Sequence, residues 1–178
     1  MINLVCIDGG SGSLRGSKLR NQFKRLLKCR GPQPVKAHYL RSAVIPILRA
    51  IRRWKIRKAL LKYASPENTL ILAGKSIGAI WALRALEKLP LPYGKVFLCT
   101  VDPHDPITQR YSYPVLARIT QGWNVFQRND RPRGGRVQHD SVSNFGVGRS
   151  DVNHWNIIFC REAVDAIKAA LDAALDDS

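Results

Sequence analysis

Ser76 lies in the segment Gly74-Lys75-Ser76-Ile77-Gly78, which directly follows the apolar run Leu70 to Ala73. A Gly-x-Ser-x-Gly spacing between a strand and a helix is typical of a sharp turn that lifts a serine hydroxyl above a sheet as a nucleophile. The two glycines relieve the crowding that such a strained turn creates. The backbone N–H of Ile77, at the helix start, is then expected to face the oxyanion that forms when Ser76 attacks a carbonyl.

Two phosphate-binding motifs come close to matching and are excluded. Gly74-Lys75-Ser76 equals the end of a Walker A motif, but that motif needs a glycine five positions earlier, where Thr69 stands. Gly10 to Gly16 resembles a dinucleotide fingerprint, but it has one residue too many before its third glycine. It also lacks an acidic residue about 20 positions later. We therefore expect no nucleotide cofactor.

A serine hydroxyl is a poor nucleophile unless a base and an orienting carboxylate accompany it. Asp102 follows the apolar run 95–101, and active groups in open α/β sheets gather at the carboxyl ends of strands. His154 lies in a polar loop just before the last helical segment, from which it can reach the sheet edge. The sequence thus predicts a triad of Ser76, His154 and Asp102. The weaker candidates for the base are His38, His104 and His139.

Alternating apolar and amphipathic segments predict the elements that position these residues. The 178 residues suit one domain, 1–178, an α/β three-layer sandwich with a mainly parallel sheet. The expected strands are 2–8, 35–40, 69–73, 95–101 and 123–127. The expected helices are 17–29, 42 or 46 to 64, 76–89 and 161–175. Residues 136–147 are expected to form a short hairpin or an irregular loop.

The second expected helix carries apolar residues at helical spacing, namely Val44, Ile47, Leu48, Ile51 and Trp54. Its other face is basic. A basic amphipathic helix can lie on a membrane, but docking on a sheet with the cations extended into solvent is the commoner arrangement. We expect the docked arrangement here.

The net charge of the chain is +16, and its distribution is uneven. No acidic residue occurs between Asp8 and Glu67, so this stretch accounts for the excess of cations. Such a surface attracts polyanions, which include nucleic acid, anionic lipid, acidic cell-wall polymers and acidic proteins. A solvated face that serves solubility explains the same charge equally well.

The four cysteines are Cys6, Cys29, Cys99 and Cys160, and their spacing is not that of metal ligands. We therefore expect free thiols and no metal. Free thiols in turn predict a reducing compartment, the cytoplasm. No apolar run approaches the roughly 20 residues of a transmembrane helix. The first residues lack the basic start and cleavage site of a signal peptide and look like a strand.

The Gly-x-Ser-x-Gly turn, the order Ser76, Asp102, His154 and a glycine-rich loop after the first strand resemble the α/β-hydrolase fold family. The likeness covers most of the chain. The missing early strands and the absence of a cap segment resemble its small, lidless members, such as cutinases. The resemblance implies that Gly10 or Ser11 gives the second N–H of the oxyanion hole. It leaves Asp130 as the alternative acid, although the position of Asp102 is similar to that in pancreatic-type lipases.

These patterns predict a serine hydrolase that acts on a carboxylic ester or thioester, in a small molecule or a polymer, without cofactor or metal. Lys75 would place a cation beside the site and favour anionic substrates. The alternative is a non-catalytic module on a hydrolase scaffold. It would bind nucleic acid or an anionic surface through its basic N-terminal third.

Overall fold

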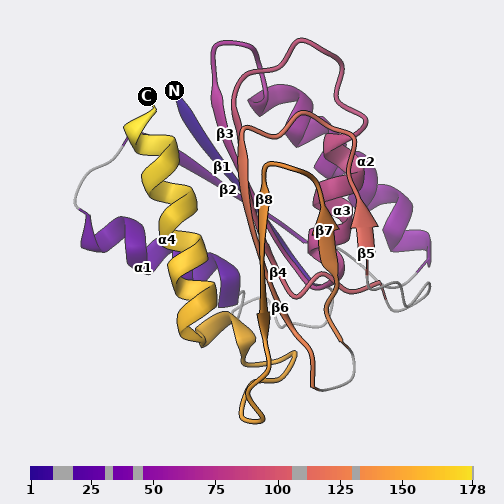
Figure 1. Cartoon of the computed structure of the whole chain (residues 1–178). Coiled ribbons are helices and arrows are strands. Elements are labelled where there is room, and N and C mark those ends of the chain that lie inside the picture. The colour runs from indigo at the N-terminus through magenta and orange to yellow at the C-terminus, as the bar shows by residue number, and fades with distance from the viewer. Residues whose placement is uncertain (10–17, 31–33, 42–45, 106–111, 130–132, 178) are drawn as a thin grey trace.

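The computed structural model describes residues 1–9, 18–30, 34–41, 46–105, 112–129 and 133–177. Its centre is a six-stranded sheet in the order β2-β1-β3-β4-β6-β8 (Figure 1). All pairings between neighbouring strands of this sheet are parallel. The strands are β1 (Ile2–Asp8), β2 (Val35–Arg41), β3 (Thr69–Lys75), β4 (Val96–Val101), β6 (Gln121–Gln127) and β8 (Val142–Val147).

Helices cover both faces of this sheet, which makes the fold a three-layer α/β arrangement (Figure 1). One face carries α1 and α4, and the other carries α2 and α3. The helices are α1 (Lys18–Cys29), α2 (Pro46–Tyr63), α3 (Ile77–Leu86) and α4 (Arg161–Asp176), and a short 3-10 helix, η1 (Ile157–Phe159), precedes α4. The expected α/β class and the mainly parallel sheet are therefore confirmed.

The strands are apolar on both faces because both faces are covered. In β1, Val5 and Ile7 pack in the core beneath α2 and α3. Leu4 and Cys6, which point the opposite way, pack in the core beneath α1 and α4. This alternation follows from strand geometry, in which successive side chains face opposite sides.

The prediction of a hairpin or irregular loop over residues 136–147 is wrong. Its first part is β7 (Arg136–Gln138), which pairs with β5 (Ser112–Pro114) in a separate two-stranded sheet. Its second part is β8, the edge strand of the main sheet. The side chain of Asn144 on β8 explains the separation: its amide donates to Val137 O (2.9 Å) and accepts from Val137 N (2.9 Å). One side chain of β8 thus forms the two hydrogen bonds to β7 that a second neighbouring strand, beside β5, would otherwise form.

The prediction of which face of α2 docks on the sheet is also wrong for the part of the helix whose side chains the structure describes. The buried residues of this helix are Ile56 and Leu60, each no more than 1% exposed. Ile51 and Trp54 were expected inward, but they are 49% and 60% exposed. The expected contribution of Val44, Ile47 and Leu48 falls on side chains outside the described set.

The other boundaries agree with expectation to within a few residues, and α3 ends at Leu86 rather than at residue 89. All four cysteines are free thiols. Of the helices in the described ranges, none combines the length and apolar character needed to cross a membrane.

Candidate active site

Ser76 occupies the single residue between β3 and α3. Its backbone has φ 54° and ψ −133°, a strained conformation for a residue with a side chain. A Cβ at position 74 would lie 2.5 Å from Ala79 Cα, and one at position 78 would lie 2.9 Å from the carbonyl carbon of Ile7. Both glycines of the motif are therefore required by close packing of the turn against the helix and β1.

The turn is fixed to the neighbouring strands on both sides. Ser76 N–H donates to Val101 O (3.0 Å), the last residue of β4. On the β1 side, a Cβ built on Gly9 would lie 3.5 Å from Ser76 Oγ, so the loop after β1 begins beside the hydroxyl. Gly10 and Ser11, the expected oxyanion donors, lie outside the described residues. Ile77 is the first residue of α3, and N–H groups of a first helical turn lack intrahelical acceptors.

Asp102 comes directly after β4 and is fully buried, with a positive φ of 51°. Its backbone N–H donates to Val125 O (2.6 Å) on β6, which holds the turn against the sheet. Its Oδ1 accepts a hydrogen bond from Gln127 N–H (3.1 Å), at the end of β6. Gly134 packs on the same oxygen, and a Cβ at that position would overlap Oδ1 and lie 2.8 Å from Cγ. The carboxylate is thus held in one orientation.

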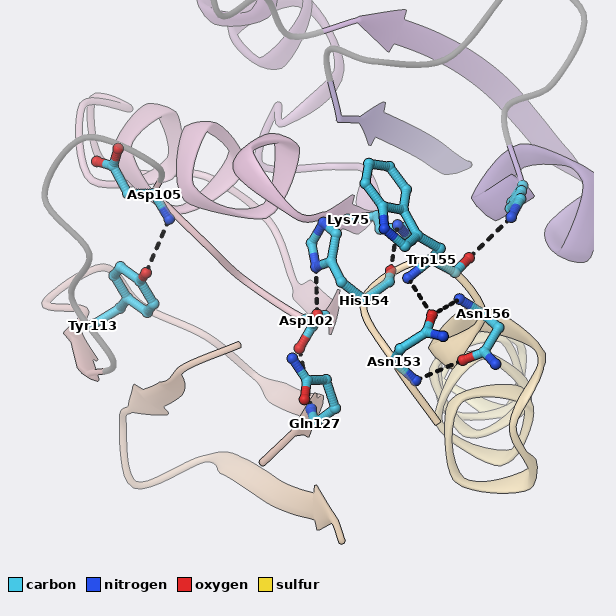
Figure 2. A network of polar contacts seen from close by, with 10 residues as sticks. Lys75, Asp102, Asp105, Tyr113, Gln127, Asn153, His154, Trp155 and Asn156 are labelled. Carbon is cyan, nitrogen blue, oxygen red and sulfur yellow. Dashed lines mark hydrogen bonds and ion pairs between the residues drawn. The ribbon is translucent and has the colours of Figure 1, made fainter. Parts of the chain in front are cut away.

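The other carboxylate oxygen of Asp102 lies 2.5 Å from His154 Nδ1, and His154 is only 5% exposed (Figure 2). An ionised carboxylate can only accept, so the proton of the imidazole is on Nδ1. The lone pair of the neutral ring is therefore on Nε2. A base oriented in this way by a buried carboxylate is the arrangement that activates a serine hydroxyl.

Lys75, the last residue of β3, fixes the segment that carries His154. Its Nζ donates to the backbone carbonyl of His154 (3.2 Å), and its side chain is 7% exposed (Figure 2). Burial lowers the pKa of Lys75, and the nearby carboxylates of Asp8 and Asp102 partly oppose this effect. The amino group of Lys75 therefore lies beside the site, as expected, but it is buried under the histidine segment.

Local hydrogen bonds order the rest of the His154 segment. Asn153 Oδ1 accepts from the backbone N–H groups of Trp155 (2.9 Å) and Asn156 (3.1 Å). Asn156 Oδ1 in turn accepts from Asn153 N–H (2.7 Å), and Lys18 Nζ on α1 donates to Trp155 O (2.9 Å). The indole of Trp155 lies edge-on to the imidazole of His154, with ring centroids 5.4 Å apart. The ring of the candidate base is therefore held from several directions.

Of the three weaker histidine candidates, only His104 lies beside His154. The two rings meet edge to face with centroids 5.9 Å apart. Burial, followed by the effect of His154, lowers the pKa of His104. His38 instead stacks on Tyr63 at 3.7 Å, and His139 Nδ1 accepts from Ser141 N–H (3.0 Å) in a turn.

Several of these contacts were not predicted from the sequence. The pair Gly134-Gly135 was a signal of close backbone approach, since adjacent glycines often mark such places. Nothing in the sequence indicated that Gln127 N–H bonds Asp102 or that Lys75 Nζ bonds the His154 carbonyl. Asp130, the alternative acid, lies outside the described residues. Within the described ranges no group of histidine, cysteine, aspartate and glutamate side chains could hold a metal ion.

Neither a scan against protein-family models nor a search of curated proteins finds a match for this chain. Any activity is therefore inferred from the geometry of the site itself.

Proposed function

We propose that this protein is a serine hydrolase of the α/β-hydrolase fold that cleaves a carboxylic ester or thioester. The observation that carries the proposal is the buried contact of 2.5 Å between His154 Nδ1 and Asp102 Oδ2, next to the strand-to-helix turn of Ser76. Burial of a histidine and an aspartate together costs free energy unless they interact, so such a pair beside the carboxyl end of β4 favours a functional role.

In the proposed reaction Ser76 Oγ attacks the carbonyl carbon while His154 Nε2 takes its proton. Asp102 stabilises the imidazolium that forms, and the proton then passes to the leaving alcohol or thiol. A water molecule then attacks the acyl-serine carbonyl while His154 Nε2 takes its proton. That proton passes to Ser76 Oγ as the carboxylic acid is released. The backbone N–H of Ile77, together with one from the 9–11 loop, stabilises the oxyanion.

The hydrogen bond between Ser76 Oγ and His154 Nε2 is the contact of this mechanism that we expect to form only when substrate binds. In the described part of the chain Ser76 Oγ has no hydrogen-bond partner. Hydrogen bonds between a nucleophile and its base are often long or poorly aligned without substrate and tighten in the Michaelis complex. The positive φ of Ser76 and its partly exposed position suit that role.

The test is labelling of the folded protein with a fluorophosphonate probe, read out by peptide mass spectrometry. We expect a covalent adduct at Ser76 in the wild type and none in Ser76→Ala. The exposed Ser143 gives the matched control, because Ser143→Ala should be labelled as the wild type is. A folded wild type that remains unlabelled at Ser76 would count against the hydrolase.

The second function that the sequence suggests is a non-catalytic module that holds a polyanion on the basic surface. Binding of that kind weakens steeply with salt and is indifferent to Ser76→Ala. Ester cleavage is lost with that substitution and depends little on salt. We also propose a reducing compartment, the cytoplasm, because all four cysteines are free thiols.

A further inference from the structure

Helix α2 exposes a line of large apolar side chains instead of burying it. Ile51 is 49% exposed, Trp54 is 60% exposed and Leu61 is 46% exposed. Residues three and seven positions apart lie on one side of a helix, so these three side chains form one ridge along the outer face of α2. We call them the α2 ridge. The opposite side of the helix, with Ile56 and Leu60, is the one docked on the sheet.

Cations flank the α2 ridge on both sides. At 100° per residue, Arg53 and Arg57 lie on one flank, and Lys55 and Lys62 lie on the other. Lys58 lies within the ridge, where its Nζ is 5.1 Å from the centre of the Trp54 ring. The ion pairs of the described residues include none with a residue of α2. The charges on this face are therefore available to an external anion.

One flank of the α2 ridge opens into a hollow of about 340 Å³ between α2 and α3. The residues of the hollow that matter here are Arg53, Trp54, Arg57, Trp81, Arg84 and Lys88. Arg84 is paired with Asp105 at 3.1 Å, and among the described residues that line the hollow Glu87 is the one carboxylate. Arg53, Arg57 and Lys88 leave this hollow with an excess of positive charge beside an exposed indole.

We propose that α2 lies flat on an anionic phospholipid surface, with the α2 ridge in the headgroup–acyl boundary and the flanking cations on lipid phosphates. An interfacial helix has this pattern, in which an apolar stripe with Trp and Leu is bordered by Lys and Arg. The hollow between α2 and α3 then accepts one phosphate headgroup. Arginine forks and a nearby indole suit an anion at the membrane interface.

The shape of the face favours lipid over nucleic acid. Nucleic acid is held by cations that project outermost onto phosphates and by aromatic rings on which bases stack. The α2 ridge, however, contains the aliphatic side chains of Ile51 and Leu61 as well as Trp54. Aliphatic side chains form no favourable contact with a phosphate backbone. Against a bilayer each of the three side chains removes apolar area from water.

Membrane binding of this kind does not depend on the hydrolase chemistry, because α2 is separate from Ser76, Asp102 and His154. The two proposals can therefore fail separately. Ser76→Ala should bind vesicles as the wild type does, and a protein that resists fluorophosphonate can still bind lipid.

The experiment is vesicle flotation of the full chain with phosphatidylcholine alone and with phosphatidylcholine mixed with phosphatidylglycerol. We expect binding to the anionic vesicles only, weakening with salt. Trp54→Ala combined with Leu61→Ser should weaken it by about tenfold or more, since both lose apolar burial. The matched control is Trp155→Ala, because Trp155 is 57% exposed but lies outside α2. This control should float with the vesicles as the wild type does.

Charge variants test the second half of the proposal. Arg53→Gln with Arg57→Gln should weaken binding by about fivefold for each cation removed. Lys28→Gln with Lys168→Gln removes equal charge from exposed positions of α1 and α4, on the other face of the sheet, and should have a smaller effect. Circular dichroism confirms that each variant is folded.

Three results would overturn the proposal. The first is equal binding to neutral and anionic vesicles, or to neither. The second is equal loss from the α2 variants and their controls. The third is binding of a single-stranded oligonucleotide, or self-association, that requires Trp54 while anionic vesicles are not bound.

Discussion

Gly134 lies directly against the carboxylate of Asp102, and a single added carbon at position 134 would overlap Oδ1. The same oxygen accepts a hydrogen bond from Gln127 N–H, and Oδ2 contacts His154 Nδ1. The rotation of the carboxyl group is thus limited by packing on one side and by hydrogen bonds on the other. A small side chain at position 134 should therefore displace the imidazole of His154 indirectly, by moving the carboxylate of Asp102.

Gly134→Ala should therefore lower ester turnover by about tenfold or more, because a displaced Asp102 no longer holds His154 in the productive orientation. Turnover and the rate of fluorophosphonate labelling measure the effect, and urea unfolding reports the accompanying loss of stability. Gly148→Ala is the control, since a Cβ there meets nothing within 4 Å. Equal turnover in the two variants would contradict the role given to Gly134.

Asp102→Asn should lower turnover on the order of a thousandfold or more, because an amide cannot stabilise the imidazolium as a carboxylate does. Steady-state kinetics with an activated ester measure the loss. Asp130→Asn removes the alternative acid and is the comparison. If Asp130→Asn causes the larger loss, the carboxylate of the triad has been misassigned.

Lys75→Met should remove the hydrogen bond to the His154 carbonyl and lower kcat more than it raises KM, because the histidine segment loses a fixed anchor. Lys75→Arg keeps a donor and a charge and should recover part of the activity. A purely structural role would instead lower stability alike in both variants without changing the kcat of the folded fraction. Thermal unfolding beside kinetics separates these outcomes.

The free energy of unfolding should fall as the pH falls below 6.5. Burial lowers the pKa of His104 in the folded protein, so between that lowered value and 6.5 the unfolded chain binds more protons. The pKa of His38 is lowered for the same main reason and adds to the slope. His104→Gln should flatten the dependence of stability on pH in denaturant titrations. A slope that is unchanged by this substitution would show that His104 does not cause it.

The native protein should present one thiol that reacts quickly. Burial raises the pKa of Cys99 to about 12 and that of Cys6 well above its ordinary value, so neither forms the reactive thiolate. Burial also raises the pKa of Cys160 to about 11, whereas Cys29 is exposed at the end of α1. Dithiobis(nitrobenzoate) should therefore release about one equivalent of thionitrobenzoate per chain in a fast phase. Cys29→Ser should abolish this fast phase, and a fast phase that survives would contradict the burial of the others.

Local rules predicted much of the architecture. Apolar runs and their breaks located every strand of the main sheet except β8, and the crowded turn at Ser76 follows from glycines two residues to either side. The contact between Asp102 and His154 brings together two residues that the sequence had placed at one sheet edge. These inferences need only strand order and direction.

Long-range packing decided what the sequence did not reveal. Helix α2 has apolar residues on two sides, and periodicity alone does not say which side meets the sheet. The sheet selects Ile56 and Leu60, which leaves Trp54 outside. Likewise, nothing local indicates that the amide of Asn144 replaces a strand beside Val137 and so divides the expected hairpin.

The parallel sheet has a consequence for how the site comes into being. The contact between Asp102 and His154 joins residues 52 positions apart, and that between Lys75 and His154 joins residues 79 apart. Parallel strands cannot be joined by tight turns, so neither contact forms before several crossovers have closed. In a nascent or partly denatured chain Ser76 is therefore present before Asp102, Lys75 and His154 have met, so the proposed activity should appear only when folding is complete.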